Sequence, residues 1–259
     1  MRQAWEGSRR STTDDKGVFV GVLDRLRADY HGDLRARVLF EVSDGLFNHA
    51  DSSSRASVRL AEGVAVRLGA PFAPTRPTGQ TAGAIFAQAT RDYLAAAFDA
   101  FSDRVPGRWE FATGPSLTSI SSFAQYEHLA ELSRLIERYR ELAATLGGDY
   151  IVTPDITISR PALDDRELFP DGDHRDSRAG DLSPTRSVNS QKLILHASVS
   201  CKWTMRSDRS QNTRTEALNL LRNRKGRAPH IIAVTMEPLP SRLASIALGT
   251  GDVDMTYHA

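Results

Sequence analysis

Three ionisable side chains have the types and spacing of a phosphodiesterase site. Asp155 follows Pro154 at the start of a β-branched stretch, Lys202 ends an apolar run 47 residues later, and Glu216 lies where a helix is expected. Carboxylates and the Cys201 main-chain carbonyl supply the oxygen ligands that Mg²⁺ prefers. A lysine beside them can orient or deprotonate a water and offset the negative charge that builds on phosphorus. The alternative is an ordinary exposed pair of Asp and Lys.

A short charged segment follows the lysine. Arg206 and Arg209 carry guanidinium forks that can bind guanine O6 and N7, and Asp208 between them can accept from cytosine N4. This alternation beside a lysine of nuclease type favours base reading, and the alternative is a salt-bridge cluster on the surface. Residues 202–227 include eight Lys and Arg and two carboxylates, which indicates either a bound polyanion or a solvated basic helix.

The composition is that of a globular protein. Of the 259 residues, 40% are hydrophobic and 25% are charged, and the formal net charge is +1. The single cysteine excludes a disulfide or a thiolate zinc cluster within one chain. Because the sequence has no membrane-length apolar run and no signal-peptide core, we expect a cytoplasmic protein with no membrane partner.

The order of the expected elements favours an α/β fold. Helical periodicity dominates the first half of the chain, and strand-like stretches alternate with helices after about residue 150. This order predicts a mixed central sheet flanked by helices. Residues 18–259 are expected to form one domain, with 1–17 disordered and 159–190 as a long surface excursion. We expect helices over 18–27, 55–68, 79–101, 125–146, 213–224 and 240–248, and strands over 150–158, 193–201, 231–235 and 253–257.

The segment 200–209 (SCKWTMRSDR), followed by Glu216, closely resembles the type IIF restriction endonucleases of the PD-(D/E)XK superfamily. Segments 79–81 (GQT), 153–155 (TPD) and 240–242 (PSR) match the same family, and the resemblance covers most of the chain from about residue 48. It implies a restriction-endonuclease-like fold and an Mg²⁺-dependent double-strand cut in GCCGGC, after the first G, which leaves 5′ CCGG overhangs. It also implies a homotetramer that engages two DNA sites, and a cognate DNA methyltransferase that protects the host's own sites.

The resemblance also implies roles for individual residues. Asp155, Lys202 and Glu216 fall on the catalytic positions, and one or two Mg²⁺ ions would be held by Asp155, Glu216 and the main chain of Cys201. The inner CCGG would be read by Arg206, Asp208 and Arg209. A minor-groove contact falls on Gln80, and the readers of the outer G·C pairs fall on Arg242 and Asp51.

One departure from the family lies inside the active site. The family has a further glutamate in the helix after GQT, and this chain has Ala87 there, with Gln88 adjacent and Asp92 one turn further on. The alternative function is therefore a catalytically impaired relative that still binds its DNA site. A nuclease without strict sequence preference is disfavoured, since phosphate binding needs no base readers. The family also continues with more helix beyond the position of Ala259, and we expect a shorter end to weaken folding or assembly.

Overall fold

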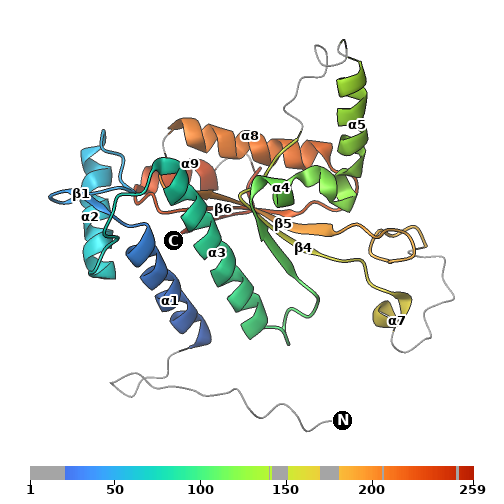
Figure 1. Cartoon of the computed structure of the whole chain (residues 1–259), viewed down its shortest axis with the longest axis horizontal. Helices are drawn as coiled ribbons and strands as arrows, with labels where there is room; N and C mark the ends of the chain where they lie inside the picture. Colours follow the sequence, from blue (N-terminus) through green and yellow to red (C-terminus); the bar gives the residue numbers. More distant parts are fainter. Residues whose placement is uncertain (1–20, 140, 142–150, 170–180, 206, 249–250) are drawn as a thin grey trace, which may run out of the picture.

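The computed structural model describes residues 21–139, 141, 151–169, 181–205, 207–248 and 251–259, without the side chains of 207–210. The expected disorder of 1–17 therefore lies outside the described residues. A five-stranded mixed sheet forms the centre of the described part, as the sequence predicts, and its strand order is β3-β4-β5-β6-β7. Figure 1 shows β4, β5 and β6 among the surrounding helices. The strands are β3 (Glu110–Thr113), β4 (Ile156–Arg160), β5 (Ile194–Lys202), β6 (His230–Thr235) and β7 (Met255–His258).

The strand directions decide which strand ends meet. β4 is antiparallel to β3 and β5, whereas β5, β6 and β7 are mutually parallel neighbours. Ile156 lies opposite Val199, and Lys202 lies opposite Thr235. The residue before β4, the last residues of β5 and the chain after β6 therefore gather at one end of the sheet.

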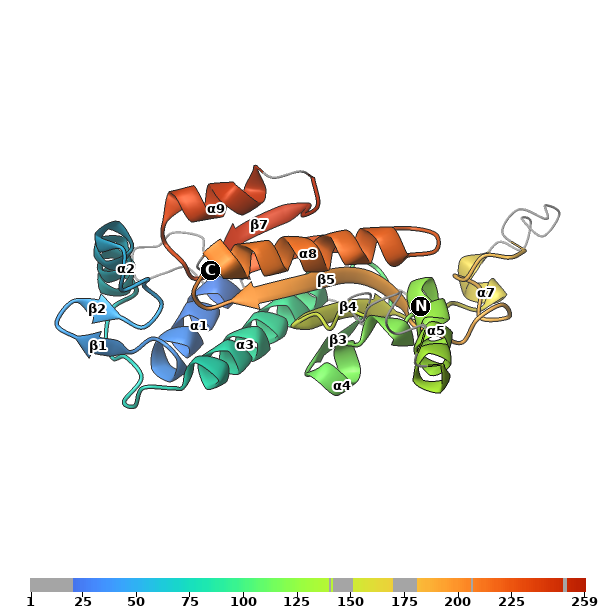
Figure 2. The same cartoon turned by 90° about the horizontal axis from the view of Figure 1, so that it is seen from above.

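Helices cover both faces of this sheet, as expected for an α/β domain. On one face, Phe86 of α3 and Val199 of β5 belong to one buried cluster. On the other face, Leu220 of α8 and Leu195 of β5 belong to a second cluster, and Figure 2 shows α8 along β5 with α1 and α3 on the opposite side. The longer helices are α1 (Val22–Arg37), α2 (Arg55–Leu68), α3 (Gly79–Ala100), α5 (Glu127–Arg138), α8 (Ser207–Asn223) and α9 (Pro240–Ala247).

Short elements complete the described fold. A small hairpin precedes α2, and short helical turns connect β3 to α5. No helix in the described ranges is both long and apolar enough to cross a membrane. The short elements are β1 (Glu41–Ser43), β2 (Leu46–Phe47), α4 (Pro115–Thr118), η1 (Ile120–Ser122), η2 (Ala124–Tyr126) and α7 (Asp165–Leu168).

Side-chain caps set where two site-bearing helices begin. Ser54 accepts from the Ser57 N–H at the start of α2, and Thr78 accepts from the Thr81 N–H at the start of α3. Each bond satisfies a first-turn N–H that the helix itself cannot. Gly69 follows α2 with a φ of 78°, a conformation that favours glycine after a helix.

Two helices are longer than the sequence predicts. α1 continues to Arg37 rather than ending near residue 27, because Tyr30 and Leu34 are buried although the residues around them are mostly polar. α8 begins at Ser207 rather than at Thr213. The apolar periodicity is weak in both extensions, so tertiary packing decides their length.

Other boundaries also differ. α5 ends at Arg138, and most of the remainder of the helix expected over 125–146 lies outside the described residues. β3 is a short strand that the sequence analysis did not predict, and it is fixed by pairing with β4. The expected excursion over 159–190 includes the end of β4 and α7, and Arg186 bonds Asp165 there (2.7 Å). Residues 170–180 lie outside the described part.

A buried histidine lies in the core behind the end of β5. His49 has 0% exposure, and its ring packs edge-on against Trp203, with centroids 5.9 Å apart. Neither ring nitrogen has a hydrogen-bond partner among the described residues. Burial, with a smaller contribution from His258, lowers the pKa of His49 to about 4.

This lowered pKa predicts a pH-dependent stability. Because the unfolded chain takes up the proton near pH 6.5 and the folded chain only near pH 4, the free energy of unfolding falls as pH decreases through this window. The expected contribution of His49 is about 3 kcal/mol. Urea unfolding of the wild type and His49→Phe at pH 7, 6 and 5 measures it. The variant should have the smaller pH slope, and equal slopes would contradict the assignment.

Candidate active site

The start of β4 and the end of β5 bring two of the predicted catalytic residues together. Asp155 Oδ2 accepts from the Cys201 N–H (2.7 Å) and from the Lys202 ammonium (3.0 Å). The side chains of Lys202 and Asp155 are 20% and 35% exposed, so the pair is partly shielded yet reachable from solvent. Among the described residues no donor bonds Asp155 Oδ1, which leaves this oxygen open to a cation.

Glu216 reaches the same place from α8. Asp155, Lys202, Glu216 and Gln80 line one cleft of about 650 Å³. Burial raises the pKa of Glu216; the Lys202 ammonium opposes this shift and the Asp155 carboxylate adds to it. Two carboxylates in one cleft, next to one lysine, form a site that a divalent cation would stabilise.

Cys201 contributes through its main chain. Burial, followed by the Asp155 carboxylate, raises the pKa of its thiol, so the thiolate that would ligate a metal is not formed at neutral pH. The N–H and C=O of one strand residue project to the same side. Since the Cys201 N–H bonds Asp155, its carbonyl also faces the Asp155 side, which suits the main-chain ligand that the sequence analysis expected.

The donor set at the cleft fits a hard cation. Asp155 and Glu216 offer carboxylate oxygens, Cys201 offers a carbonyl, and Mg²⁺ commonly completes such sets with waters and substrate phosphate oxygens. Within the described ranges, no group of three or more His, Cys, Asp and Glu side chains could hold a metal. A cation at this cleft would therefore depend on water and phosphate oxygens as well as on the protein.

The candidate base readers lie in two places. Gln80, exposed in the first turn of α3, lines the catalytic cleft. Asp208 and Arg209 lie in the first turn of α8, but their side chains are outside the described part. Arg206 also lies outside the described residues. The two residues expected at the outer base pairs, Asp51 and Arg242, form a second group.

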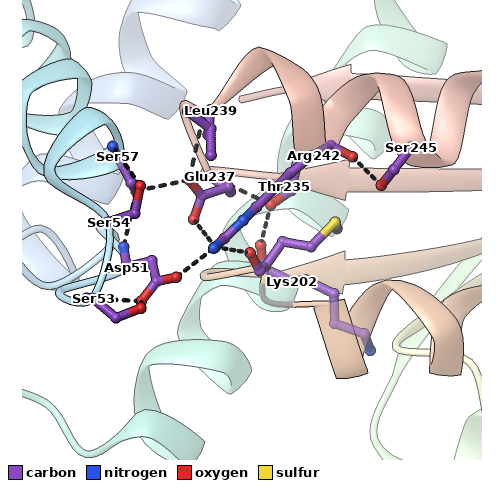
Figure 3. Close-up of polar contacts among 11 residues, drawn as sticks. Asp51, Ser53, Ser54, Ser57, Lys202, Thr235, Glu237, Leu239, Arg242 and Ser245 are labelled. Carbon is purple, nitrogen blue, oxygen red and sulfur yellow. Dashed lines mark hydrogen bonds and ion pairs between the residues drawn. The ribbon is translucent and has the colours of Figure 1, made fainter.

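Asp51 and Arg242 are bonded to each other although they are 191 residues apart in the chain. Arg242 Nη2 donates to Asp51 Oδ2, and Nη1 donates to the Met205 carbonyl (2.5 Å). A buried carboxylate, Glu237, lies 3.4 Å from Nη1 and also accepts from the Ser57 hydroxyl (2.8 Å). Figure 3 shows the guanidinium between the two carboxylates.

Residues 30–259 match the sequence profile of the NgoMIV restriction enzyme family. The chain belongs to this family. The type II restriction enzyme NgoMIV of Neisseria gonorrhoeae is 41% identical over 227 residues, which are 87% of this chain and 79% of that protein. The NgoMIV-family protein described here is a type II restriction endonuclease, a nuclease that cuts DNA at specific sites.

Ala87, where the resemblance implies a further glutamate, faces the candidate cleft of this NgoMIV-family enzyme. Ala87 is 8% exposed and lines the cleft, as does Gln88. The Gln88 amide accepts from Thr113 Oγ1 (3.1 Å) and donates to the Asp92 carboxylate (3.2 Å). Asp92 is not among the described residues that line the cleft. Neither neighbour brings a carboxylate to the position of Ala87.

Sequence reasoning missed Thr235 and Glu237, which contact Lys202 and Arg242. Thr235 Oγ1 donates to the Lys202 carbonyl (2.7 Å) and accepts from the Glu237 N–H (3.1 Å), so the end of β6 is fastened to the end of β5 in this NgoMIV-family enzyme. Glu237 is fully buried. An acid directly after the apolar run 231–236 (IIAVTM) was the available signal, because a charge there must find a partner.

Proposed function

We propose that this enzyme cuts double-stranded DNA within GCCGGC, after the first G, and leaves 5′ CCGG overhangs. The observation that carries the proposal is the meeting of Asp155, Lys202 and Glu216 in one cleft. These residues come from three separate elements, and their types are those that phosphodiester hydrolysis requires. The sequence GCCGGC itself rests on the family resemblance of the base-reading residues.

We propose that Mg²⁺ is the cofactor, held by Asp155, Glu216 and the Cys201 carbonyl. When bound there, the ion would supply Lewis-acid polarisation of the scissile phosphate. Asp155 positions Lys202 through the 3.0 Å bond, and Lys202 lines the cleft in which the scissile phosphate would lie. As an ammonium, Lys202 would orient the attacking water and offset the charge that develops on phosphorus.

We propose that the segment 206–209 reads the inner CCGG. Arg206 and Arg209 would bind guanines and Asp208 would bind a cytosine in the major groove, where each base pair has its own pattern of donors and acceptors. Gln80 would contact the central bases from the minor groove, which its exposed place beside the cleft supports. Asp51 and Arg242 would read the outer G·C pairs, and their direct bond supports a joint role.

Replacing Arg209 with alanine is expected to lower discrimination at one inner guanine by about 1–3 kcal/mol. Anisotropy titrations with GCCGGC duplexes and with duplexes changed at an inner G·C pair measure this difference. The matched control is Arg222→Ala in the last turn of α8. Loss of a phosphate contact there would weaken binding to both duplexes alike. If Arg209→Ala bound both duplexes with wild-type affinities, Arg209 would not be a base reader.

We propose two further properties, which the family resemblance implies. The enzyme acts as a homotetramer that engages two DNA sites, and a cognate methyltransferase protects the host's own sites. Plasmids with one and with two GCCGGC sites test the first, because an assembly that needs two sites cuts the two-site plasmid faster at equal site concentration.

The second candidate function is a DNA-binding relative with impaired catalysis, favoured by Ala87 in the cleft. Digestion of a two-site plasmid with Mg²⁺, followed by sequencing of the fragment ends, separates the two functions. Discrete ends after the first G of GCCGGC would support the nuclease and show that Ala87 is tolerated. Retained site-specific binding without cutting would support the impaired relative.

A further inference from the structure

Glu237 is a buried carboxylate that the cleavage chemistry does not use. It follows β6, has 0% exposure, and lies outside the catalytic cleft. A buried charge is costly unless it is paired and hydrogen-bonded. Oε1 accepts from Ser57 Oγ (2.8 Å) and from the Leu239 N–H (3.2 Å), and Oε2 lies 3.4 Å from Arg242 Nη1.

These contacts fix Glu237 more firmly than a surface carboxylate. Ser57 belongs to α2, whose N-terminal loop carries Asp51, so one carboxylate joins this loop to the α9 arginine. The Ser57 hydroxyl also accepts from the Asp51 N–H (2.9 Å). The Glu237 carboxylate is therefore linked to Asp51 through Ser57 and contacts Arg242 directly.

Arg242 is consequently held on three sides. Asp51, Glu237 and the Met205 carbonyl take three of its five N–H groups. Among the described residues nothing bonds the other two N–H groups, and two is the number that a bidentate contact to guanine O6 and N7 requires. Met205 directly precedes the base-reading segment that leads into α8. The same contacts thus place Arg242 against Met205, the residue before the segment that is proposed to read the inner bases.

The charges around Arg242 also favour base reading over phosphate binding. Asp51 and Glu237 place two carboxylates against one guanidinium, so Arg242 is already paired and offers little attraction to a phosphate. The Arg242 guanidinium, followed by Ser53, holds the pKa of Asp51 well below its usual value, so this carboxylate stays charged near neutral pH. Arg242 is therefore better suited to donating hydrogen bonds to the edge of a neutral base than to binding a phosphate without sequence preference.

We propose that Glu237 is the positioning residue that sets specificity at the outer base pair, by holding Arg242 in the orientation that reads guanine. The inference rests on the proposed function, because it requires a recognition site with an outer G·C pair. Glu237 acts through Arg242 and touches no base itself. Its loss changes the choice of the outer pair and spares the reading of the inner CCGG.

The test compares Glu237→Gln with the wild type by equilibrium binding to three labelled duplexes. They contain GCCGGC, ACCGGT with the outer pair changed, and GCTAGC with the inner pairs changed. Glutamine keeps the volume and can still accept from Ser57, but its neutral amide no longer attracts the guanidinium. We expect preference for GCCGGC over ACCGGT to fall about tenfold, and preference over GCTAGC to stay within about threefold. Because binding is measured, the test applies equally to an active and an impaired enzyme.

A merely structural role for Glu237 would weaken binding to all three duplexes and leave both ratios unchanged, which would overturn the inference. Ser57→Ala, a smaller change that removes one tether of the carboxylate, should lower the outer ratio in the same direction by about threefold. This second variant keeps the test decisive if Glu237→Gln does not fold. The control is Glu131→Gln, whose side chain is 58% exposed on α5 and should leave both ratios unchanged.

The wild-type result distinguishes an error in the proposed recognition site from an error in the role of Glu237. If the wild type does not prefer GCCGGC over ACCGGT, the proposed site is wrong and the role of Glu237 falls with it. If the wild type has this preference and both variants keep it, only the role of Glu237 is wrong.

Discussion

Replacing Lys202 with alanine is expected to lower the rate of DNA cleavage by about 10²–10³-fold or more. The ammonium lies 3.0 Å from Asp155 in the cleft and is the only described cation that lines it. Its removal takes away both the group that positions the water and the charge that offsets the developing negative charge on phosphorus. The bond from the Cys201 N–H to Asp155 remains, so the junction between β4 and β5 should stay intact.

Single-turnover cleavage with Mg²⁺ and anisotropy binding of the same duplex measure the two effects separately. Binding of Lys202→Ala to GCCGGC should stay within about threefold of the wild type, because a lone lysine contributes one phosphate contact at most. The matched control is Lys192→Ala, which removes an exposed ion pair with Glu127 and should change neither quantity. Cleavage by Lys202→Ala within tenfold of the wild type would exclude the proposed catalytic role.

Asp155→Asn is expected to reduce Mg²⁺-dependent cleavage at least as strongly as Lys202→Ala does. Asparagine keeps the shape and an oxygen acceptor for the Cys201 N–H, but it removes the charge that would bind a divalent cation. It also leaves Lys202 without its counter-ion. Since changes beyond the direct ligands already lower metal affinity 10–100-fold, loss of a direct ligand should lower it by more than about 100-fold.

Calorimetric titration of the protein–DNA complex with Ca²⁺, a hard cation with the same oxygen ligands, measures the affinity without relying on cleavage. Asp92→Asn is the matched control, because Asp92 is an exposed carboxylate that bonds Gln88 outside the described cleft lining. Its affinity should equal that of the wild type. If Asp92→Asn lowered the affinity for Ca²⁺ as much as Asp155→Asn does, Asp92 would have taken over the role of the missing glutamate.

The sequence was sufficient to predict a mixed sheet flanked by helices, and it placed the candidate catalytic residues next to strands of that sheet. β4 and β6 are rich in β-branched residues, so local propensity and tertiary structure agree there. β4 begins directly after Asp155, and β5 and β6 end at Lys202 and Thr235. Asp155 and the segment 198–216 contain the candidate catalytic residues and the proposed readers of the inner bases. Their types alone indicated a phosphodiesterase, and the resemblance supplied the family that the comparison confirmed.

The remaining features depend on contacts that local sequence patterns do not reveal. The extension of α1 relies on burial of Tyr30 and Leu34, and β3 exists because β4 offers it a partner. The role of Glu237 depends on Ser57, which lies 180 residues away. Buried charges of this kind require partners from distant elements, and only the folded chain shows which partners they have.

The burial of Cys201 has a practical consequence for measurements on this enzyme. The chain has one cysteine, and burial raises the pKa of its thiol, so thiol reagents should react slowly with the wild type at neutral pH. A cysteine introduced at an exposed position, such as Glu131→Cys on α5, would then be labelled selectively. Energy transfer between that label and a dye on the duplex could follow DNA binding and release without altering the residue beside Lys202.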